Sequence, residues 1–184
     1  MIFSDKTFLR FIIVFTAVFL LCYFGALFFT GLAVPGGNYS PFVDKYFDVA
    51  AVLRTALIYF SKWVLGIFGT ETYRADEYVL RAVSGKGIRL VYSCLGFGVM
   101  SFWAAYSVAM SGNWMNKAKW LAGGLLIIFF INTARISLVL QAANRGWDFP
   151  FGWDHHTWFN IVSYIFILLM IFWHQHITSK IADE

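Results

Sequence analysis

The sequence predicts an all-α integral membrane protein with four transmembrane helices. Of its 184 residues, 60% are hydrophobic and only 13% are charged, whereas a soluble domain carries about a quarter charged residues. So few charges cannot cover a globule of this size with a surface that water tolerates. Four apolar runs are each about 20 residues long, the length that a helix needs to cross a hydrocarbon core of about 30 Å. We expect a single polytopic membrane domain over residues 1–184.

The composition also excludes other classes of protein and partner. Phe alone occurs 21 times and Cys only twice, which is incompatible with a disordered chain or a disulfide scaffold. The 14 Lys and Arg residues against 10 Asp and Glu give a net charge of +4. These basic residues are scattered and form no dense stripe, so the expected partner is the lipid bilayer and not a nucleic acid.

The expected spans are residues 11–33, 94–112, 120–143 and 157–177. The first run is longer than the apolar region of a signal peptide, which has about 7–15 residues, so it is interpreted as a membrane anchor. Ser93 is a plausible N-cap for the second span.

Residues 34–93 form the expected extracytoplasmic insert. Within it, residues 49–69 read as an amphipathic helix lying on the membrane, because Arg54 and Lys62 are eight positions apart and share roughly one helix face. A charge at the bilayer centre costs about 2.5–3.5 kcal/mol, which disfavours insertion. The count is therefore four spans, or five if residues 49–69 insert.

Residues 77–92 change to the period of β-strands. Two alternating runs flank Ser84-Gly85-Lys86-Gly87, a pattern typical of a short β-hairpin. Strands with open edges cannot face lipid, so this hairpin is expected outside the bilayer.

The distribution of basic residues predicts the orientation in the cell (inner or cytoplasmic) membrane. In the four-span arrangement Arg145 is the basic residue of a short loop on one side, and five basic residues flank the spans on the other side: Lys6, Arg10, Lys117, Lys119 and Lys180. The positive-inside rule then places the N- and C-termini in the cytoplasm.

Three polar residues stand out against this apolar background and form the candidate site. Cys94 begins the second span, Arg135 lies inside the next one, and His156 begins the last. Arg135 is about 15 residues into a helix that starts on the opposite side, or roughly 22 Å at 1.5 Å per residue. All three residues are therefore expected at one membrane face.

These residue types suit cysteine acyl transfer. A thiol at a helix N-terminus near a cation ionises more readily than a free one. An imidazole can take the thiol proton and pass it to a leaving amine. A guanidinium can bind a substrate carboxylate or an oxyanion. Gly96 and Gly98 would leave room beside the sulfur for a peptide backbone.

Each residue also has a structural explanation. Cys94 could be a small core hydrophobe, Arg135 could extend towards a helix end, and His155 and His156 could belong to a polar interfacial belt. A metal site is not expected, because His155 and His156 are separated from His174 and His176 by about 20 helical residues, or roughly 30 Å. No cofactor is expected either.

The order of these motifs resembles the exosortase/archaeosortase family of polytopic membrane cysteine transpeptidases, over roughly residues 40–177. The matching pieces are Cys94-Leu95-Gly96, Asn132-Thr133-Ala134-Arg135 and His156. The family's Cys usually stands in Cys-Ser-Gly, so this chain keeps the Gly and lacks the Ser.

The resemblance implies a function and a set of roles. Cys94 would cleave the C-terminal sorting signal of an exported protein at the extracytoplasmic face, forming a thioester that an acceptor such as a lipid or glycan resolves. The substrate tail would carry a short motif, a membrane helix and a basic cluster. The catalytic residues would be Cys94, Arg135 and His156, with supporting roles for Asn132, His155, Asp154 and Gly96. The family's register favours His156 over His155 as the base.

Two other functions remain open at this point. One is a non-catalytic membrane subunit for polysaccharide export or assembly, which needs no reactive thiol. The other is a membrane acyltransferase that uses lipid donors, which only a product assay would separate.

Overall fold

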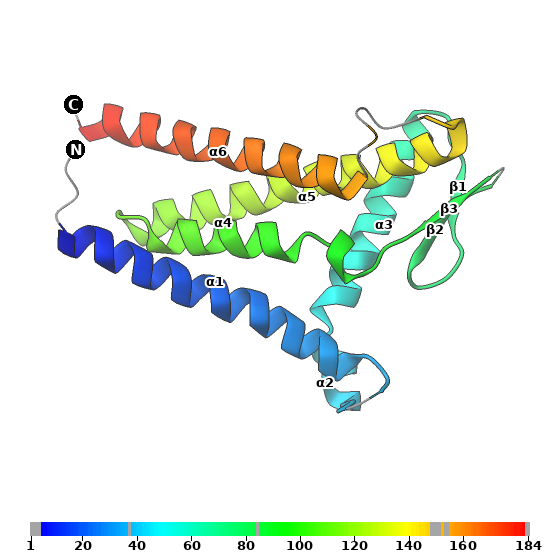
Figure 1. The fold of residues 1–184 in the computed structure, drawn as a ribbon, viewed down its shortest axis with the longest axis horizontal. Coiled ribbons are helices and arrows are strands. Elements are labelled where there is room, and N and C mark those ends of the chain that lie inside the picture. The colour runs from blue at the N-terminus through cyan, green and yellow to red at the C-terminus, as the bar shows by residue number, and fades with distance from the viewer. Residues whose placement is uncertain (1–4, 37, 84, 148–151, 153–154, 183–184) are drawn as a thin grey trace. The chain divides into compact units, whose positions relative to one another are not determined.

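The computed structural model describes residues 5–36, 38–83, 85–147, 152 and 155–182. The chain divides into two compact units, Met1–Gly146 and Trp147–Glu184. The first unit contains all of the strands and most of the helices of the described chain (Figure 1). Among its described residues, the second unit contains the helix α6 (His155–Ala182).

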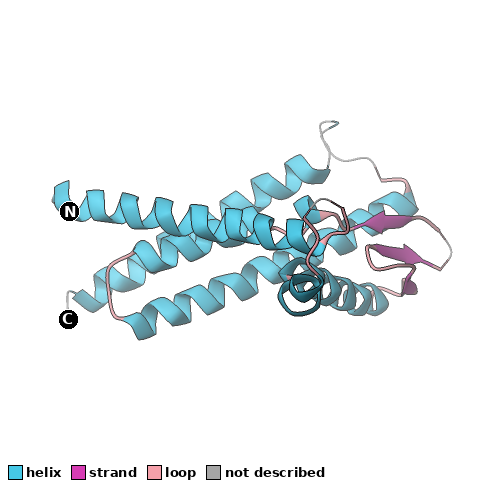
Figure 2. Cartoon of the chain, turned by 90° about the horizontal axis from the view of Figure 1, so that it is seen from below, coloured by secondary structure: helices cyan, strands magenta, loops and turns pink. Residues whose placement is uncertain are grey.

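The elements of the first unit follow one another along the chain with short connections. In order they are α1 (Asp5–Ala33), α2 (Pro41–Phe47), α3 (Val49–Ile67), β1 (Thr72–Arg74), β2 (Val79–Ala82), β3 (Gly87–Arg89), the 3-10 turn η1 (Tyr92–Cys94), α4 (Phe97–Ala109) and α5 (Trp114–Arg145). Helices predominate, and the small sheet is the exception, as Figure 2 shows.

The predicted class of all-α membrane protein with four long apolar helices is confirmed, although one of the four differs from the prediction. Helices long and apolar enough to cross a membrane are found at Lys6–Ala33, Val49–Ile67, Trp114–Arg145 and Asn160–Ile177. The predicted span at 94–112 contains only the 13 residues of α4, about 20 Å of helix at 1.5 Å per residue. Its place among the four is taken by α3.

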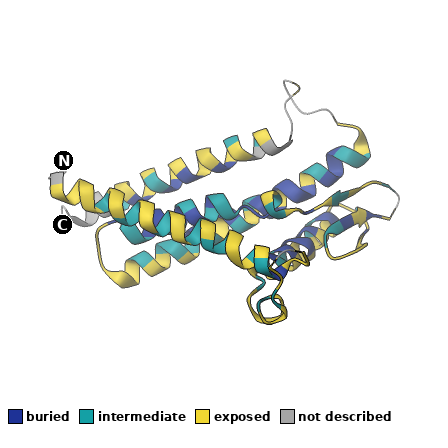
Figure 3. Cartoon of the chain, turned by 60° about the horizontal axis from the view of Figure 1, so that its bottom comes forward, coloured by how far each residue is buried: buried dark blue, intermediate teal, exposed yellow. Residues whose placement is uncertain are grey.

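The direction of α3 nevertheless fits the predicted surface helix. Figures 1 and 2 show α3 running steeply across the approximate common direction of α1, α4 and α5. Helices that cross one bilayer lie close to its normal, so this steep inclination is the one expected of the predicted surface helix, although α3 is long and apolar enough to span. Most of α1 is exposed to its surroundings (Figure 3), as expected for a helix that faces lipid.

The predicted polar face of α3, shared by Arg54 and Lys62, is wrong. Lys62 is exposed, whereas Arg54 is only 4% exposed. Arg54 Nη1 forms an ion pair with Glu77 Oε1 at 2.9 Å, and its guanidinium carbon lies 4.0 Å from the centre of the Tyr78 ring. These two partners stabilise the guanidinium in a buried position.

The predicted hairpin is confirmed and is part of a larger sheet. β2 and β3 pair antiparallel with Leu80 opposite Ile88, and β1 adds a third strand in the order β1-β2-β3. One face of the sheet packs on α3 and α5, where Leu80 and Leu90 lie in a buried cluster with Leu57 and Leu140. This packing holds the sheet against the helices at the end of β3, where η1 begins.

Candidate active site

Cys94 lies in a short turn between the sheet and α4. Its backbone N–H donates to Val91 O at 2.8 Å, and the N–H of Leu95 donates to Tyr92 O at 3.0 Å. The Tyr92 ring stacks on Phe97 with 5.0 Å between ring centres. Burial, with a smaller contribution from Tyr23, raises the pKa of the Tyr92 phenol, so this side chain stays neutral at physiological pH. Cys94 itself is half-buried.

The prediction that Cys94 begins a helix, with Ser93 as its N-cap, is wrong. The N-cap of α4 is Gly96, and the helix starts at Phe97. Gly96 has a φ of +81°, a left-handed conformation that interrupts helical geometry and that glycine adopts without steric cost. Cys94 is therefore presented by a turn that precedes the helix.

Asn132 of α5 binds the backbone of this turn. Its Nδ2 donates to Cys94 O at 3.1 Å and to Leu95 O at 3.0 Å, and the residue is fully buried. A Cβ atom added at Gly96 would lie 3.4 Å from Asn132 Nδ2, which is ordinary van der Waals contact, so the positive φ and not a lack of space calls for glycine here. One buried amide thus satisfies two carbonyl groups of the irregular segment, which would be costly to leave unpaired.

Arg135 brings a positive charge to the same turn. Its Nη2 lies 4.0 Å from Cys94 Sγ, and its Nη1 donates at 3.4 Å to both Cys94 O and Asn132 Oδ1. The side chain is 8% exposed, so water screens it little. The guanidinium is therefore placed to act on negative charge that develops at or beside the sulfur during a reaction.

The structure therefore brings together four of the seven predicted site residues: Cys94, Gly96, Asn132 and Arg135. Helix depth predicted that Arg135 and Cys94 share one membrane face, and the contact between their side chains agrees with that expectation. His155 and His156 are the first two residues of α6. Their side chains, and the whole of Asp154, lie outside the described residues, so the assignment of the base stays a prediction.

Sequence reasoning missed the buried ion pair of Arg54. The signal was present, because Arg54 falls within the stripe of α3 that faces the core, at helical spacing from its buried neighbours Ala50, Leu57, Ile58, Ser61 and Leu65. An arginine inside such a stripe predicts a buried partner. That partner, Glu77, is 23 positions away and had no signal of its own.

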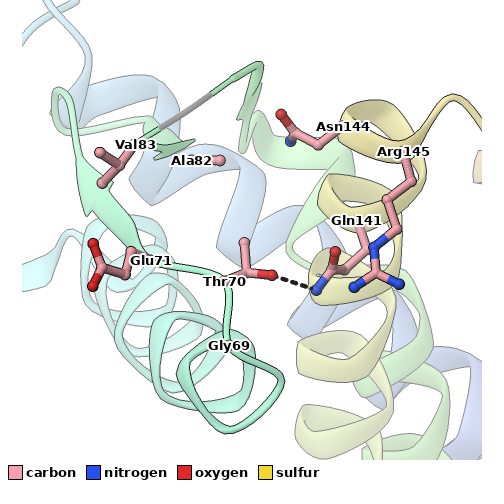
Figure 4. A pocket seen from close by; sticks show the side chains of 8 residues that line it. All are labelled: Gly69, Thr70, Glu71, Ala82, Val83, Gln141, Asn144 and Arg145. Carbon is pink, nitrogen blue, oxygen red and sulfur yellow. Dashed lines mark hydrogen bonds between the residues drawn. The ribbon is translucent and has the colours of Figure 1, made fainter.

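A polar pocket of about 390 Å³ lies at the C-terminal end of α5 (Figure 4). Two of the residues that line it are joined by a hydrogen bond of 2.7 Å, which Gln141 Nε2 donates to Thr70 Oγ1. Gln141 is nine positions beyond Asn132, which corresponds to roughly 13 Å along the helix. The pocket is therefore distinct from the turn that carries Cys94.

These features define a class: a polytopic membrane protein in which a half-buried cysteine lies against a buried arginine. The model of the transmembrane exosortase family matches residues 7–173. The chain belongs to this family. No curated protein and no solved structure matches it.

If the chain carries out the tail cleavage that its family membership implies, replacement of Asn132 by Asp is expected to lower the cleavage rate by about ten- to a hundredfold, with a smaller loss for Asn132→Ala. Asp keeps the size of Asn but cannot donate to the two carbonyls, and an unpaired buried polar group costs about 1–3 kcal/mol. The measurement is the rate of tail cleavage in membranes.

Thr133→Ala is the matched control, because Thr133 Oγ1 bonds to Phe129 O of its own helix. Wild-type rates for Asn132→Asp would show that the turn holds its shape without this amide.

Proposed function

We propose that this protein is a cysteine transpeptidase that cleaves the C-terminal sorting signals of exported proteins and transfers them to an acceptor. Family membership supports the class of reaction. The observation that carries the proposal for this chain is the contact of 4.0 Å between Arg135 Nη2 and Cys94 Sγ, on a turn that Asn132 holds.

The first half-reaction forms an acyl-enzyme. The Cys94 thiolate attacks the carbonyl carbon of the peptide bond that precedes the tail, and the oxyanion of the tetrahedral intermediate is stabilised by hydrogen-bond donors and by positive charge. In the proposed roles, His156 takes the thiol proton and Arg135 supplies the charge. The C–N bond then breaks, and His156 returns the proton to the leaving amine of the tail.

The second half-reaction resolves the thioester. An amine or hydroxyl group of the acceptor loses its proton to the base and attacks the thioester carbonyl. The C–S bond breaks, and the sulfur leaves as a thiolate, so the enzyme is regenerated. The proposed acceptor is a lipid or glycan in or near the bilayer, and the proposed substrate carries a motif, a membrane helix and a basic cluster at its C-terminus.

The reaction is proposed to take place at the extracytoplasmic face of the cell membrane, with both termini in the cytoplasm. The excess of basic residues beside the ends of the spans opposite the sheet supports this orientation.

The direct test is co-expression of the chain with the C-terminally tailed proteins of its own genome. Loss of the tail, seen as a change of mass at the new C-terminus, would support the proposal. A new C-terminus joined to an acceptor group distinguishes transfer from hydrolysis. Retention of all tails would contradict the proposal.

The orientation predicts which engineered cysteines react from outside the cell. In a background with Cys22→Ala and Cys94→Ala, Lys86→Cys is expected to react with an impermeant maleimide in intact cells, whereas Asn116→Cys reacts only after lysis. The two sites lie at opposite ends of α5, because Asn144 near its C-terminus bonds to the backbone of Lys86 at 2.7 Å.

Equal labelling of both cysteines in lysed cells is the control for accessibility. Labelling of Asn116→Cys alone in intact cells would place the site on the cytoplasmic face.

A further inference from the structure

We infer that the free edge of β3 binds the substrate as an added β-strand, using the residues that precede the bond attacked by Cys94. This inference rests on the proposed function and deepens it, because it states how the same site recognises an exported protein. The occupant is an extended segment of the exported chain.

The hydrogen-bond pattern of the sheet shows which backbone groups of β3 are available. Leu90 N donates to Tyr78 O at 2.8 Å and Ala82 N donates to Lys86 O at 3.2 Å, so the even-numbered residues of β3 bond to β2. In an antiparallel pair the intervening residues direct their N–H and C=O groups the other way. Gly87 and Arg89 therefore present their backbone groups away from β2.

No further strand covers these groups within the part of the chain that the structure describes. β3 is the last strand in the order β1-β2-β3, and both Gly87 and Arg89 are exposed. An edge of this kind is a template for an incoming extended peptide, whose main chain completes the ladder.

The edge leads directly to the nucleophile. Arg89 and Cys94 are five positions apart (94 − 89 = 5), and the chain passes from β3 into η1 without another element. Figure 1 shows the sheet and α4 on opposite sides of η1. Since an open sheet edge does not face lipid, the sheet extends from the site into water, where an exported protein arrives.

The direction of the substrate follows from its membrane helix. In the proposed substrate this helix comes after the cleaved bond, so the residues before the bond must extend away from the bilayer. β3 runs towards Cys94, and the added strand must also run towards the sulfur. We therefore infer a parallel pairing of the substrate with β3.

The charges beside the edge favour a different partner over a second copy of this chain. Lys86 and Arg89 are both exposed, and two copies paired edge to edge would bring these cations together. The outer edge of β1 lies beyond β2, two strand spacings or about 9.5 Å away, and no chain leads from it to Cys94.

The test measures peptide binding to the Cys94→Ala protein in lipid nanodiscs, so that binding is read separately from cleavage. The probes are synthetic peptides that span the segment before the membrane helix in the tailed proteins of the same genome. Arg89→Pro is compared with Arg89→Ala, since both variants lose the guanidinium and only Pro loses the outward N–H. The expected result is a Kd at least about ten times higher for Arg89→Pro than for Arg89→Ala.

Arg74→Pro and Arg74→Ala form the matched control at the opposite edge. Ala75 N donates to Val79 O and Val83 N to Glu71 O, so Arg74 also presents its N–H outward, and its two variants should bind alike. In a second measurement that leaves the protein edge intact, N-methylation of successive peptide amides should weaken binding at every second position.

Equal Kd values for Arg89→Pro and Arg89→Ala, no alternation along the peptide, or no binding of any peptide would overturn the inference. Edge-dependent binding without tail loss by the unmodified protein would instead reject the proposed function and leave the binding edge in place. Tail loss at the same rate in Arg89→Pro and Arg89→Ala would support the proposed function and reject the binding edge.

Discussion

Replacement of Cys94 by Ala is expected to abolish loss of the C-terminal tail from the exported substrate. The proposed acyl-enzyme forms on Cys94 Sγ, and alanine has no atom that can carry the acyl group. The measurement is the mass of the co-expressed substrate, which should equal that of the unprocessed protein. Cys94→Ser should lose nearly as much activity, because a serine hydroxyl is a far weaker nucleophile at neutral pH.

The chain offers its own control for this experiment. Cys22 is the other free cysteine, and it lies in α1. Cys22→Ala should process the tail at the wild-type rate. If Cys94→Ala also released the tail, the cysteine mechanism would be wrong. The remaining candidates would then be a non-catalytic membrane subunit and a membrane acyltransferase that uses lipid donors.

Replacement of Arg135 by Lys is expected to reduce the rate of tail cleavage by about 10²–10³, the usual cost of removing one oxyanion donor. Lysine keeps the positive charge but loses the planar fork. In the structure that fork reaches Cys94 Sγ with one nitrogen and the carbonyl of the same residue with another. Lysine would have to make both contacts from a single nitrogen, without the fixed spacing between the two nitrogens of the guanidinium.

Arg145→Lys is the matched control, because Arg145 lies on the same helix ten positions further on, beside the pocket of Figure 4. It should cleave the tail at close to the wild-type rate. The rate of alkylation of Cys94 by iodoacetamide as a function of pH gives a second measurement of the effect of Arg135 on the thiol. Full activity in Arg135→Lys would mean that a point charge is sufficient.

The sequence was sufficient for the class of protein and for the shared depth of Cys94 and Arg135. Long apolar runs have one physical explanation, because no other environment tolerates so few charges. Their shared depth followed from helix rise, since a helix has a fixed length per residue, whereas the contact between them is visible only in the structure. The hairpin was readable because glycines at its turn separate two runs with the period of strands.

The remaining features depend on contacts between distant residues. The start of α4 moved from Cys94 to Phe97 because Gly96 takes a left-handed conformation, and nothing in the local sequence distinguishes it from a glycine within a helix. Arg54 was assigned to a polar face because its counter-ion, Glu77, is far away in the sequence. β1 has only three residues, too few to show a period.

The hydrogen bonds of Asn132 also have a consequence for biogenesis. They join a turn at residues 94–95 to a helix 37 and 38 positions further along the chain. A ribosome synthesises the sheet and Cys94 well before it completes α5. For that interval the nascent chain contains the thiol but lacks the Asn132 amide and the Arg135 guanidinium that contact its turn. The nucleophile is therefore assembled late, after α5 has entered the membrane, and a chain arrested before that point contains Cys94 but no site.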